Sequence, residues 1–159
     1  MRAAILTVST SKASGGGEDE SGERLAQFAR ELGAEVAAKD VVADDRPLIA
    51  DRLRDWADAA GYDLVLTTGG TGFSPTDLTP EATRDVIERE APGLAEAMRA
   101  ASRDHTPNWM LSRGVAGLRG RTLIVNFPGS PASIAQAGAA IAAALPHALE
   151  LAAGRPSHH

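Results

Sequence analysis

The sequence predicts a single α/β domain in three layers, with a mostly parallel sheet between two layers of helices. Three observations support this fold class. The chain has 159 residues, the length of one ordinary domain. Four short runs are rich in apolar and β-branched residues, and the segments between them repeat apolar residues with helical spacing. Strands that alternate with helices need crossover connections, which build a parallel sheet covered on both faces.

The predicted strands span residues 3–9, 36–42, 64–68 and 122–127. Between the first two, an apolar stripe with i, i+3, i+4, i+7 spacing predicts a helix that Gly33 ends. Its members are Leu25, Phe28, Ala29 and Leu32. A second stripe predicts the next helix, which ends at Gly61; it comprises Ile49, Leu53, Trp56 and Ala60.

Proline residues mark the remaining helices. The segment Thr79-Pro80-Glu81 predicts a helix start, because it combines a capping residue, a proline and an acid; this helix should stop before Pro92. Another helix is expected over residues 94–101, and the last begins at Ser130-Pro131 and is kinked or ended by Pro146. Residues 105–120 have weak periodicity and are expected to form a long, functional or mobile loop.

Composition excludes several classes of protein. The net charge of −5, with three Phe, two Trp and one Tyr, argues against a nucleic-acid partner. The near-apolar stretch 137–145 is too short to cross a bilayer, and no secretory signal is expected, so we predict a soluble protein with no membrane partner. The absence of cysteine excludes disulfides, a thiolate zinc site and a cysteine nucleophile, and favours the cytoplasm. We expect one domain over residues 1–156 and a tail over 157–159, whose two histidines carry no argument.

Glycine-rich and polar turns follow the predicted strands. Ligands of parallel sheets bind beyond the carboxyl ends of the strands, so these turns form the candidate site. The turn Gly69-Gly70-Thr71-Gly72 lets backbone amides approach a phosphate, and a second helix start at Gly129-Ser130 should lie on the same edge. Taken alone, the first turn favours a tight strand-to-helix connection, and the second helix start at Gly129-Ser130 shifts the balance toward phosphate binding.

Asp44 and Asp77 are the candidate catalytic and metal-binding carboxylates. A polyphosphate site in an acidic protein needs Mg²⁺ to bridge the negative charges. A structural alternative stays open, in which Asp44 or Asp45 caps a helix and Asp77 braces the turn before Thr79. Asp19 and Ser21 likewise fit the start of a helix.

The predicted long loop holds three further candidates. The pair Ser112-Arg113 suits phosphate binding or stacking on a flat ring, and Trp109 either covers a ring-shaped ligand or anchors the loop. His105 and His147 lack the spacing of metal ligands, so zinc is not expected.

Together these residues resemble the molybdopterin adenylyltransferase family of molybdenum-cofactor biosynthesis, which includes the amino-terminal domain of gephyrin. The most specific block is TGGTGFSPTDLTPEAT at residues 68–83, which resembles the family signature GGTG, four residues, D, one residue, TPEAT. Similar blocks stand in the family's order over nearly the whole chain: DESG at 19–22, REAPG at 89–93, MLSR at 110–113, NFPGS at 126–130 and ALPH at 144–147.

The resemblance implies a molybdopterin-binding, Rossmann-like fold and a nucleotidyltransferase. In the implied reaction, the terminal phosphate of molybdopterin attacks the α-phosphate of ATP in the presence of Mg²⁺ and releases pyrophosphate. The family's functional carboxylates map onto Asp44 and Asp77, and its members are trimers or hexamers. The residues that the resemblance assigns to substrate binding are Ser9, Thr10, Asp19, Ser21, Gly22, Gly69, Gly70, Thr71, Gly72, Thr79, Glu81, Ser112, Arg113, Asn126, Pro128, Gly129 and Ser130.

Two positions depart from the family pattern. The first strand usually ends in Ser-Asp, whereas here Ser9-Thr10 stands, and Thr76 occupies a place often held by arginine. These departures leave a non-catalytic molybdopterin carrier or scaffold as the main alternative. Other enzymes that share the fold, and a generic nucleotide-binding module, are further alternatives.

Overall fold

The computed structural model describes residues 1–155, in which a central sheet is enclosed by helices. The tail over residues 157–159, with His158 and His159, lies outside the described residues. The strands are β1 (Arg2–Val8), β2 (Glu35–Val42), β3 (Leu64–Thr68), β4 (Arg89–Glu90), β5 (Ala116–Arg119) and β6 (Thr122–Phe127). The helices are α1 (Thr10–Ala13), α2 (Glu20–Glu31), α3 (Arg46–Arg54), α4 (Thr79–Arg84), α5 (Pro92–Ala101), α6 (Pro131–Ile141) and α7 (Leu145–Ala152), with a π-helical segment η1 (Asp55–Ala59) and a 3₁₀ turn η2 (Trp109–Leu111).

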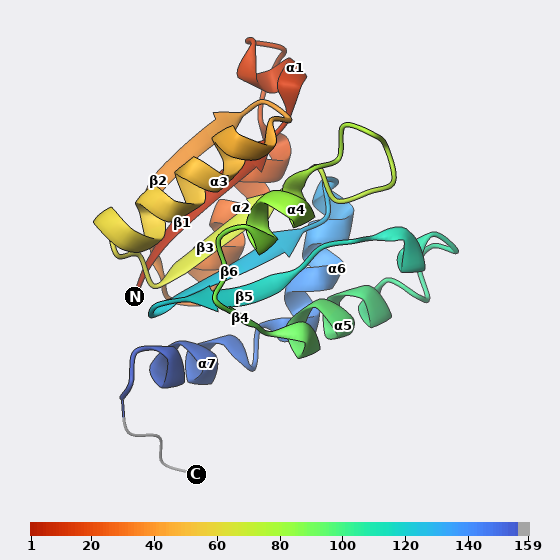
Figure 1. Cartoon of the computed structure of the whole chain (residues 1–159). Coiled ribbons are helices and arrows are strands. Elements are labelled where there is room, and N and C mark those ends of the chain that lie inside the picture. Colours follow the sequence, from red (N-terminus) through yellow and green to blue (C-terminus); the bar gives the residue numbers. More distant parts are fainter. Residues whose placement is uncertain (156–159) are drawn as a thin grey trace.

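The sheet of the described residues has six strands in the order β2-β1-β3-β6-β5-β4 (Figure 1). β1 pairs in parallel with both β2 and β3, and β3 pairs in parallel with β6. β5 is antiparallel to both of its neighbours. The predicted α/β class, the four predicted strands and the mostly parallel sheet are therefore confirmed.

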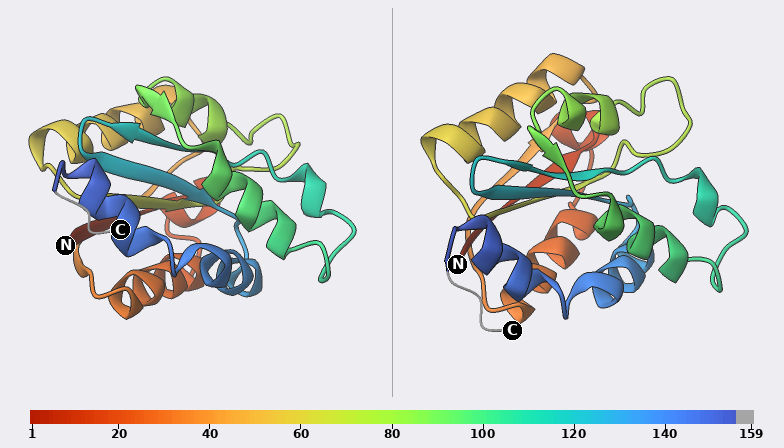
Figure 2. Two further views of the ribbon diagram at one scale, coloured as in Figure 1. Left: turned by 90° about the horizontal axis from the view of Figure 1, so that it is seen from below. Right: turned by 60° about the horizontal axis from the view of Figure 1, so that its bottom comes forward.

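Helices cover both faces of the sheet, as Figure 2 shows. On one face, α2, α5, α6 and α7 pack on the strands; the largest fully buried side chains of this core include Ile5, Leu25, Leu66, Phe127 and Ile134. On the other face, α3, η1 and α4 bury Leu6, Ile49, Leu53 and Ile124. Successive side chains of β1 point to opposite faces of the sheet and are buried in opposite cores. This alternation fixes the strand's register.

Two predictions about the middle of the chain were wrong. Residues 105–120 were expected to form a loop, but they include η2 and the strand β5. The helix expected to run from Thr79 to Pro92 ends at Arg84, because the amides of Glu88 and Ala91 pair with the carbonyls of Leu118 and Ala116 in β5. β5 is only four residues long and β4, at the sheet edge, only two, so they carry little apolar periodicity.

The last predicted helix is divided in two. α6 ends at Ile141, and Pro146 lies in the first turn of a separate helix α7. Proline suits that position because the amides of a helix's first turn have no acceptor within the helix, so the missing N–H costs no hydrogen bond. Within residues 1–155 no single helix is long and apolar enough to span a membrane, and α6 and α7 meet that criterion only as a pair bent by 68°.

Candidate functional site

Four parallel strands, β1, β2, β3 and β6, end at one edge of the sheet, and the predicted site residues gather there. In Figure 1 the loop that follows β3 and the segment that precedes β5 extend beyond this edge. The segment before β5 reaches the edge because β5 runs antiparallel to β6. Loops far apart in sequence thus border one site.

The turn after β3 requires its glycines. Gly69 and Gly70 have φ angles of +93° and +69°. A Cβ atom on Gly69 would stand 2.3 Å from the carbonyl oxygen of Val8, and one on Gly70 would stand 2.3 Å from the hydroxyl oxygen of Thr79. Both the backbone conformation and the space therefore exclude a side chain.

The carbonyl groups of this turn all point into the protein. Thr79 donates its hydroxyl to the Gly69 oxygen (2.9 Å) and its amide to the Gly70 oxygen (3.1 Å). Arg113 donates its amide to the Thr71 oxygen and its Nε to the Gly72 oxygen, both at 2.8 Å. In a trans peptide the N–H points opposite to the C=O, and the described residues contain no cis peptide. The amides of residues 70–73 are thereby turned outward, an arrangement that suits an anion.

Asn126 fixes the floor beneath the turn. This residue is 4% exposed, and its Nδ2 donates to the hydroxyls of Thr67 and Thr83, both at 3.0 Å. Its Oδ1 accepts the amide of Val115 at 3.1 Å. Because these bonds use its side-chain amide within the protein, Asn126 ties β6 to α4 and to the residue before β5.

Asp77 lies in the loop between the turn and α4. Its Oδ2 accepts the Ser74 amide at 3.0 Å, and its own amide donates to the Ser74 carbonyl at 2.9 Å. Within residues 1–155 the other carboxylate oxygen, Oδ1, accepts no hydrogen bond. The structural alternative for this residue is thus partly realised, and one oxygen is left for a ligand.

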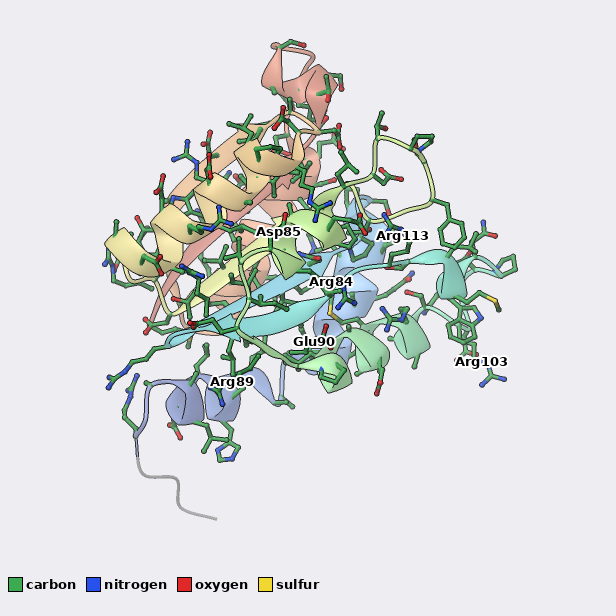
Figure 3. The ribbon with its side chains drawn as sticks, viewed as in Figure 1. Arg84, Asp85, Arg89, Glu90, Arg103 and Arg113 are labelled. Carbon is green, nitrogen blue, oxygen red and sulfur yellow. The ribbon has the colours of Figure 1, made fainter. Side chains whose placement is uncertain are left out.

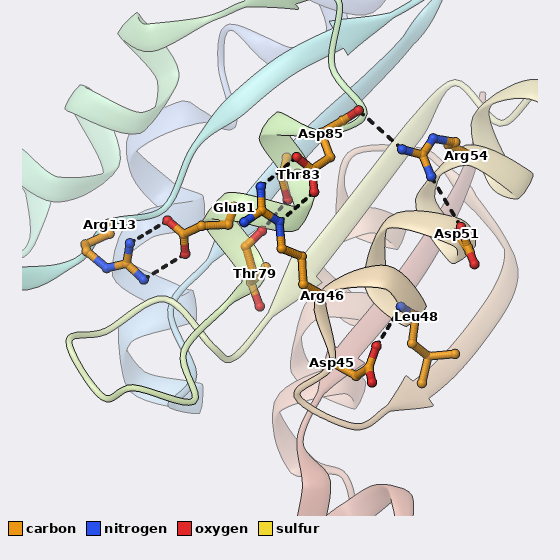
Figure 4. Close-up of polar contacts among 10 residues, drawn as sticks. All are labelled: Asp45, Arg46, Leu48, Asp51, Arg54, Thr79, Glu81, Thr83, Asp85 and Arg113. Atoms are coloured by element: carbon orange, nitrogen blue, oxygen red, sulfur yellow. Dashed lines mark hydrogen bonds and ion pairs between the residues drawn. The ribbon is translucent and has the colours of Figure 1, made fainter.

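Asp44 follows β2 and is held by Thr10, the first residue of α1. Asp44 Oδ2 accepts from the Thr10 hydroxyl (2.8 Å) and the Thr10 amide (3.1 Å). The Asp44 amide donates to the same hydroxyl at 3.0 Å. The helix cap at α3 is Asp45 and not Asp44, since Asp45 accepts the Leu48 amide at 3.0 Å (Figure 4). Ser9 caps α1 by accepting the amide of Lys12.

The start of α2 closes the site against β6. Asp19 caps the helix by accepting the Gly22 amide at 2.9 Å, and its second oxygen accepts the Thr7 hydroxyl at 2.7 Å. A Cβ on Gly22 would stand 2.1 Å from this carboxylate, so a side chain at position 22 would displace the Asp19 carboxylate from its two donors. The Ser21 hydroxyl donates to the Gly129 carbonyl at 2.6 Å.

The turn after β6 leads into α6. Thr68 donates its hydroxyl to the Pro128 carbonyl at 2.6 Å, which joins this turn to the end of β3. Ser130 caps α6: its hydroxyl oxygen accepts the Ser133 amide at 3.2 Å. The N-terminus of α6 thus opens toward the same edge as the glycine turn.

Arg113 forms a forked ion pair with Glu81 on α4 (Figure 4). Its Nη1 and Nη2 lie 2.8 and 3.1 Å from the two carboxylate oxygens, and Nη2 also donates to the Asp77 carbonyl at 2.7 Å. Hydrogen bonds from Arg113 hold the pKa of Glu81 below its usual value, so Glu81 is ionised at neutral pH. On the same side, Arg84 and Glu90 form a further ion pair (Figure 3) and line a polar groove of about 370 Å³ with Glu81 and Arg113.

A cavity of about 280 Å³ lies beside the turn, between α5, α6 and the segment before β5. Of the predicted residues, Ser112, Asn126 and Pro128 line it. Trp109 also lines the cavity, and the guanidinium carbon of Arg103 lies over its ring, 6.0 Å from the ring centroid. Sequence reasoning missed the α5 wall formed by Ala95, Arg99 and Ser102; their i, i+4, i+7 spacing was the available signal.

The chain matches the family model described as "probable molybdopterin binding domain" over residues 4–147. It is 39% identical to the molybdopterin adenylyltransferase of Helicobacter pylori J99 over 152 residues, which are 94% of this chain and 86% of that protein. It is 40% identical over 148 residues to the molybdenum cofactor synthesis protein cinnamon of Drosophila melanogaster; the match covers 92% of this chain and 25% of cinnamon.

Solved structures show the same fold. The molybdopterin biosynthesis enzyme MoaB of Thermus thermophilus superposes with a TM-score of 0.91 at 49% identity, covering 98% of each chain. The molybdopterin biosynthesis Mog protein of Mycobacterium ulcerans gives a TM-score of 0.89 at 43% identity, covering 95% of this chain and 98% of that one.

Proposed function

Because this chain belongs to the probable molybdopterin binding domain family, we propose that it is a molybdopterin adenylyltransferase. One observation carries the proposal beyond the family: outward amides of the turn at residues 69–72 stand beside Asp77 and a cavity of about 280 Å³. The turn suits a nucleotide phosphate, and the cavity suits the second substrate. Two adjacent sites at one sheet edge are what a transfer between two bound molecules requires.

In the proposed reaction an oxygen of the terminal phosphate of molybdopterin attacks the α-phosphorus of ATP. A bond forms between that oxygen and the α-phosphorus, and the bond from the α-phosphorus to the bridging oxygen breaks. Pyrophosphate leaves with the bond electrons, and adenylyl-molybdopterin is the product. The protein's contribution is positioning and stabilisation of charge. The amides of the turn and the N-terminus of α6 hold phosphate oxygens, while Ser112 and Pro128 border the molybdopterin.

The donor set fits Mg²⁺ brought in with the nucleotide. Among residues 1–155 no group of three or more His, Cys, Asp or Glu side chains is placed to hold a metal ion alone. Mg²⁺ does not need such a cage, since it binds through one or two carboxylates and substrate phosphates. Asp44 and Asp77 each use only Oδ2 in hydrogen bonds within the described residues, and we assign the remaining oxygens to the metal. The bound ion would neutralise phosphate charge.

We further propose a cytoplasmic homo-oligomer, a trimer or hexamer, with one domain over residues 1–156. An apolar groove supports self-association; it lies between α5, α6, α7 and β5 and includes Leu94, Leu118, Ala144 and Leu151. Leu151 is 51% exposed in the single chain. A second copy would cover this surface.

The test mixes purified protein with molybdopterin, ATP and Mg²⁺ and measures adenylyl-molybdopterin by mass. Wild-type protein should form product only with the metal. Asp77→Asn keeps the size and an acceptor for Ser74 but loses the charge, and should lower the rate by at least about 100-fold. Asp45→Asn is the matched control, because Asp45 caps α3, and should retain activity.

Each outcome decides between the candidate functions. Product that depends on both Mg²⁺ and Asp77 supports the transferase. Binding of molybdopterin without product would favour a non-catalytic carrier and direct attention to Thr10 and Thr76. Absence of binding would contradict both functions.

A further inference from the structure

Arg113 bonds to three backbone carbonyls of the loop that carries Asp77. Its amide and Nε hold the carbonyls of Thr71 and Gly72, and its Nη2 holds the carbonyl of Asp77. The remaining guanidinium contacts go to Glu81. In all, the guanidinium makes four hydrogen bonds to protein acceptors. A guanidinium has five N–H donors, so little of this one is left for a phosphate.

These bonds determine where two backbone amides point. The Thr71 and Gly72 carbonyls face Arg113, so the next amides in the chain, those of Gly72 and Phe73, face the opposite way. Thr79 orients the first half of the turn in the same way, because it donates hydrogen bonds to the carbonyls of Gly69 and Gly70. Arg113 therefore orients the half of the turn that lies nearer Asp77.

Arg113 also joins the turn to the cavity. Its chain neighbours Ser112 and Gly114 line that cavity, whereas its side chain reaches the loop on the nucleotide side. A shift of Arg113 would therefore move the wall of the molybdopterin cavity relative to the turn amides on the nucleotide side. Its charge is balanced by Glu81, so the pair adds no net charge next to the phosphates.

Resting on the proposed function, we propose that Arg113 is a positioning residue: with Glu81 as its anchor, it aligns the amides of Gly72 and Phe73 and the Asp77 loop with the molybdopterin cavity, and does not itself bind phosphate. This replaces the sequence-based expectation that Arg113 is a substrate ligand. Its effect should fall on the turnover number, since alignment errors of about 1 Å cost about 100-fold in rate.

The test compares Arg113→Lys with Arg119→Lys. Arg119 on β5 makes an equivalent fork with Asp58 at 2.9 and 2.8 Å and a bond to the Val86 carbonyl at 2.9 Å, away from the site edge. Lysine keeps the charge at both positions but cannot make the planar fork. Arg113→Lys should lower kcat about 100-fold with little change in KM for ATP; Arg119→Lys should leave both unchanged.

Glu81→Gln distinguishes positioning from direct binding. If Arg113 is a positioning residue, Glu81→Gln lowers kcat, and combining it with Arg113→Lys adds little further loss. If Arg113 is a phosphate ligand, freeing it from Glu81 lowers KM for ATP, and Arg113→Lys raises it. Either of those KM results overturns the proposal, as does an unchanged kcat in Arg113→Lys.

Hydrogen exchange tests the positioning separately from the chemistry. The amides of Ser74 and Asp77 are hydrogen-bonded within the loop and should exchange faster in Arg113→Lys, but not in Arg119→Lys. Unchanged exchange would overturn the positioning role. If wild-type protein makes no adenylylated product while exchange responds as expected, the proposed function fails and the positioning role stands.

Discussion

Thr10 shows how one residue sets the environment of a candidate catalytic group. The family resemblance places an acid at this position, but here the hydroxyl and amide of Thr10 both donate to Asp44. A second carboxylate at this distance would repel the first. Thr10 instead donates two hydrogen bonds to the carboxylate and fixes its direction.

Replacing Thr10 tests this interpretation. Thr10→Val removes the hydroxyl and both of its bonds with Asp44, whereas Thr10→Ser keeps them. Because one hydrogen bond to a charged group is worth about 1.5 kcal/mol, we expect Thr10→Val to lower adenylyl transfer by about tenfold. Steady-state rates for both variants provide the measurement. Equal rates for valine and serine would show that Thr10 does not position Asp44.

At the scale of elements, α6 and α2 are packed too closely for a side chain at Gly138. A Cβ there would stand 2.8 Å from the ring of Phe28, which itself packs on Phe127 with 5.5 Å between centroids. Alanine would gain about 0.5–1 kcal/mol in helix propensity. The clash with a ring held between two helices and the sheet should outweigh that gain, because overpacking costs about 1–3 kcal/mol.

We therefore expect Gly138→Ala to lower the free energy of unfolding, as measured by urea denaturation. Gly93→Ala in α5 is the control, because a Cβ at position 93 meets no atom within 4 Å. That variant should raise stability by about 0.5 kcal/mol. A stabilised Gly138→Ala would contradict the close packing of α2 on α6.

The strands that the sequence predicted and those that it missed differ in what stabilises them: burial of apolar side chains in the first case, and close backbone pairing in the second. β1, β3 and β6 are almost wholly buried and show this directly as apolar runs. β4 is a two-residue edge strand, and its pairing with β5 depends on Gly117, where a Cβ would stand 2.8 Å from the Arg89 carbonyl. A glycine chosen for close backbone approach weakens the strand pattern that sequence analysis relies on.

The candidate site divides in a similar way. Glycine and proline pairs such as Gly69-Gly70 and Pro128-Gly129 predicted where the turns lie, because those turns require special backbone conformations. The side-chain partners of Asp44 and Arg113 were not predictable, since they lie 34 and 32–41 positions away in sequence. Only the three-dimensional structure shows that Arg113 faces Glu81 and backbone carbonyls.

At the scale of the whole molecule, ion pairs connect elements that the chain separates. Lys39 and Arg30 lower the pKa of Glu23, Arg119 lowers that of Asp58, and Arg46 lowers that of Asp85 (Figure 4). These carboxylates tie α2 to β2, η1 to β5 and α3 to the end of α4, and Glu81 ties α4 to the segment before β5. All are in contact with water, so each contributes modestly and salt screens it.

These shifts set the sign of the pH dependence of folding. A carboxyl group whose folded pKa lies below its unfolded pKa binds fewer protons in the folded state, so it contributes stability above the unfolded value and loses it as pH falls through the folded value. The ordinary pKa values of the side chains, which the unfolded chain approximates, are 4.5 for Glu and 3.8 for Asp. The urea midpoint should therefore fall as the solution is acidified below about pH 4.5, and high salt should lower the midpoint at neutral pH.

Asp58→Asn removes one of these groups and should make the decline shallower, whereas Asp104→Asn, at an exposed position with no ion pair among the described residues, should not. A midpoint that holds or rises on acidification would show that these pairs do not stabilise the fold.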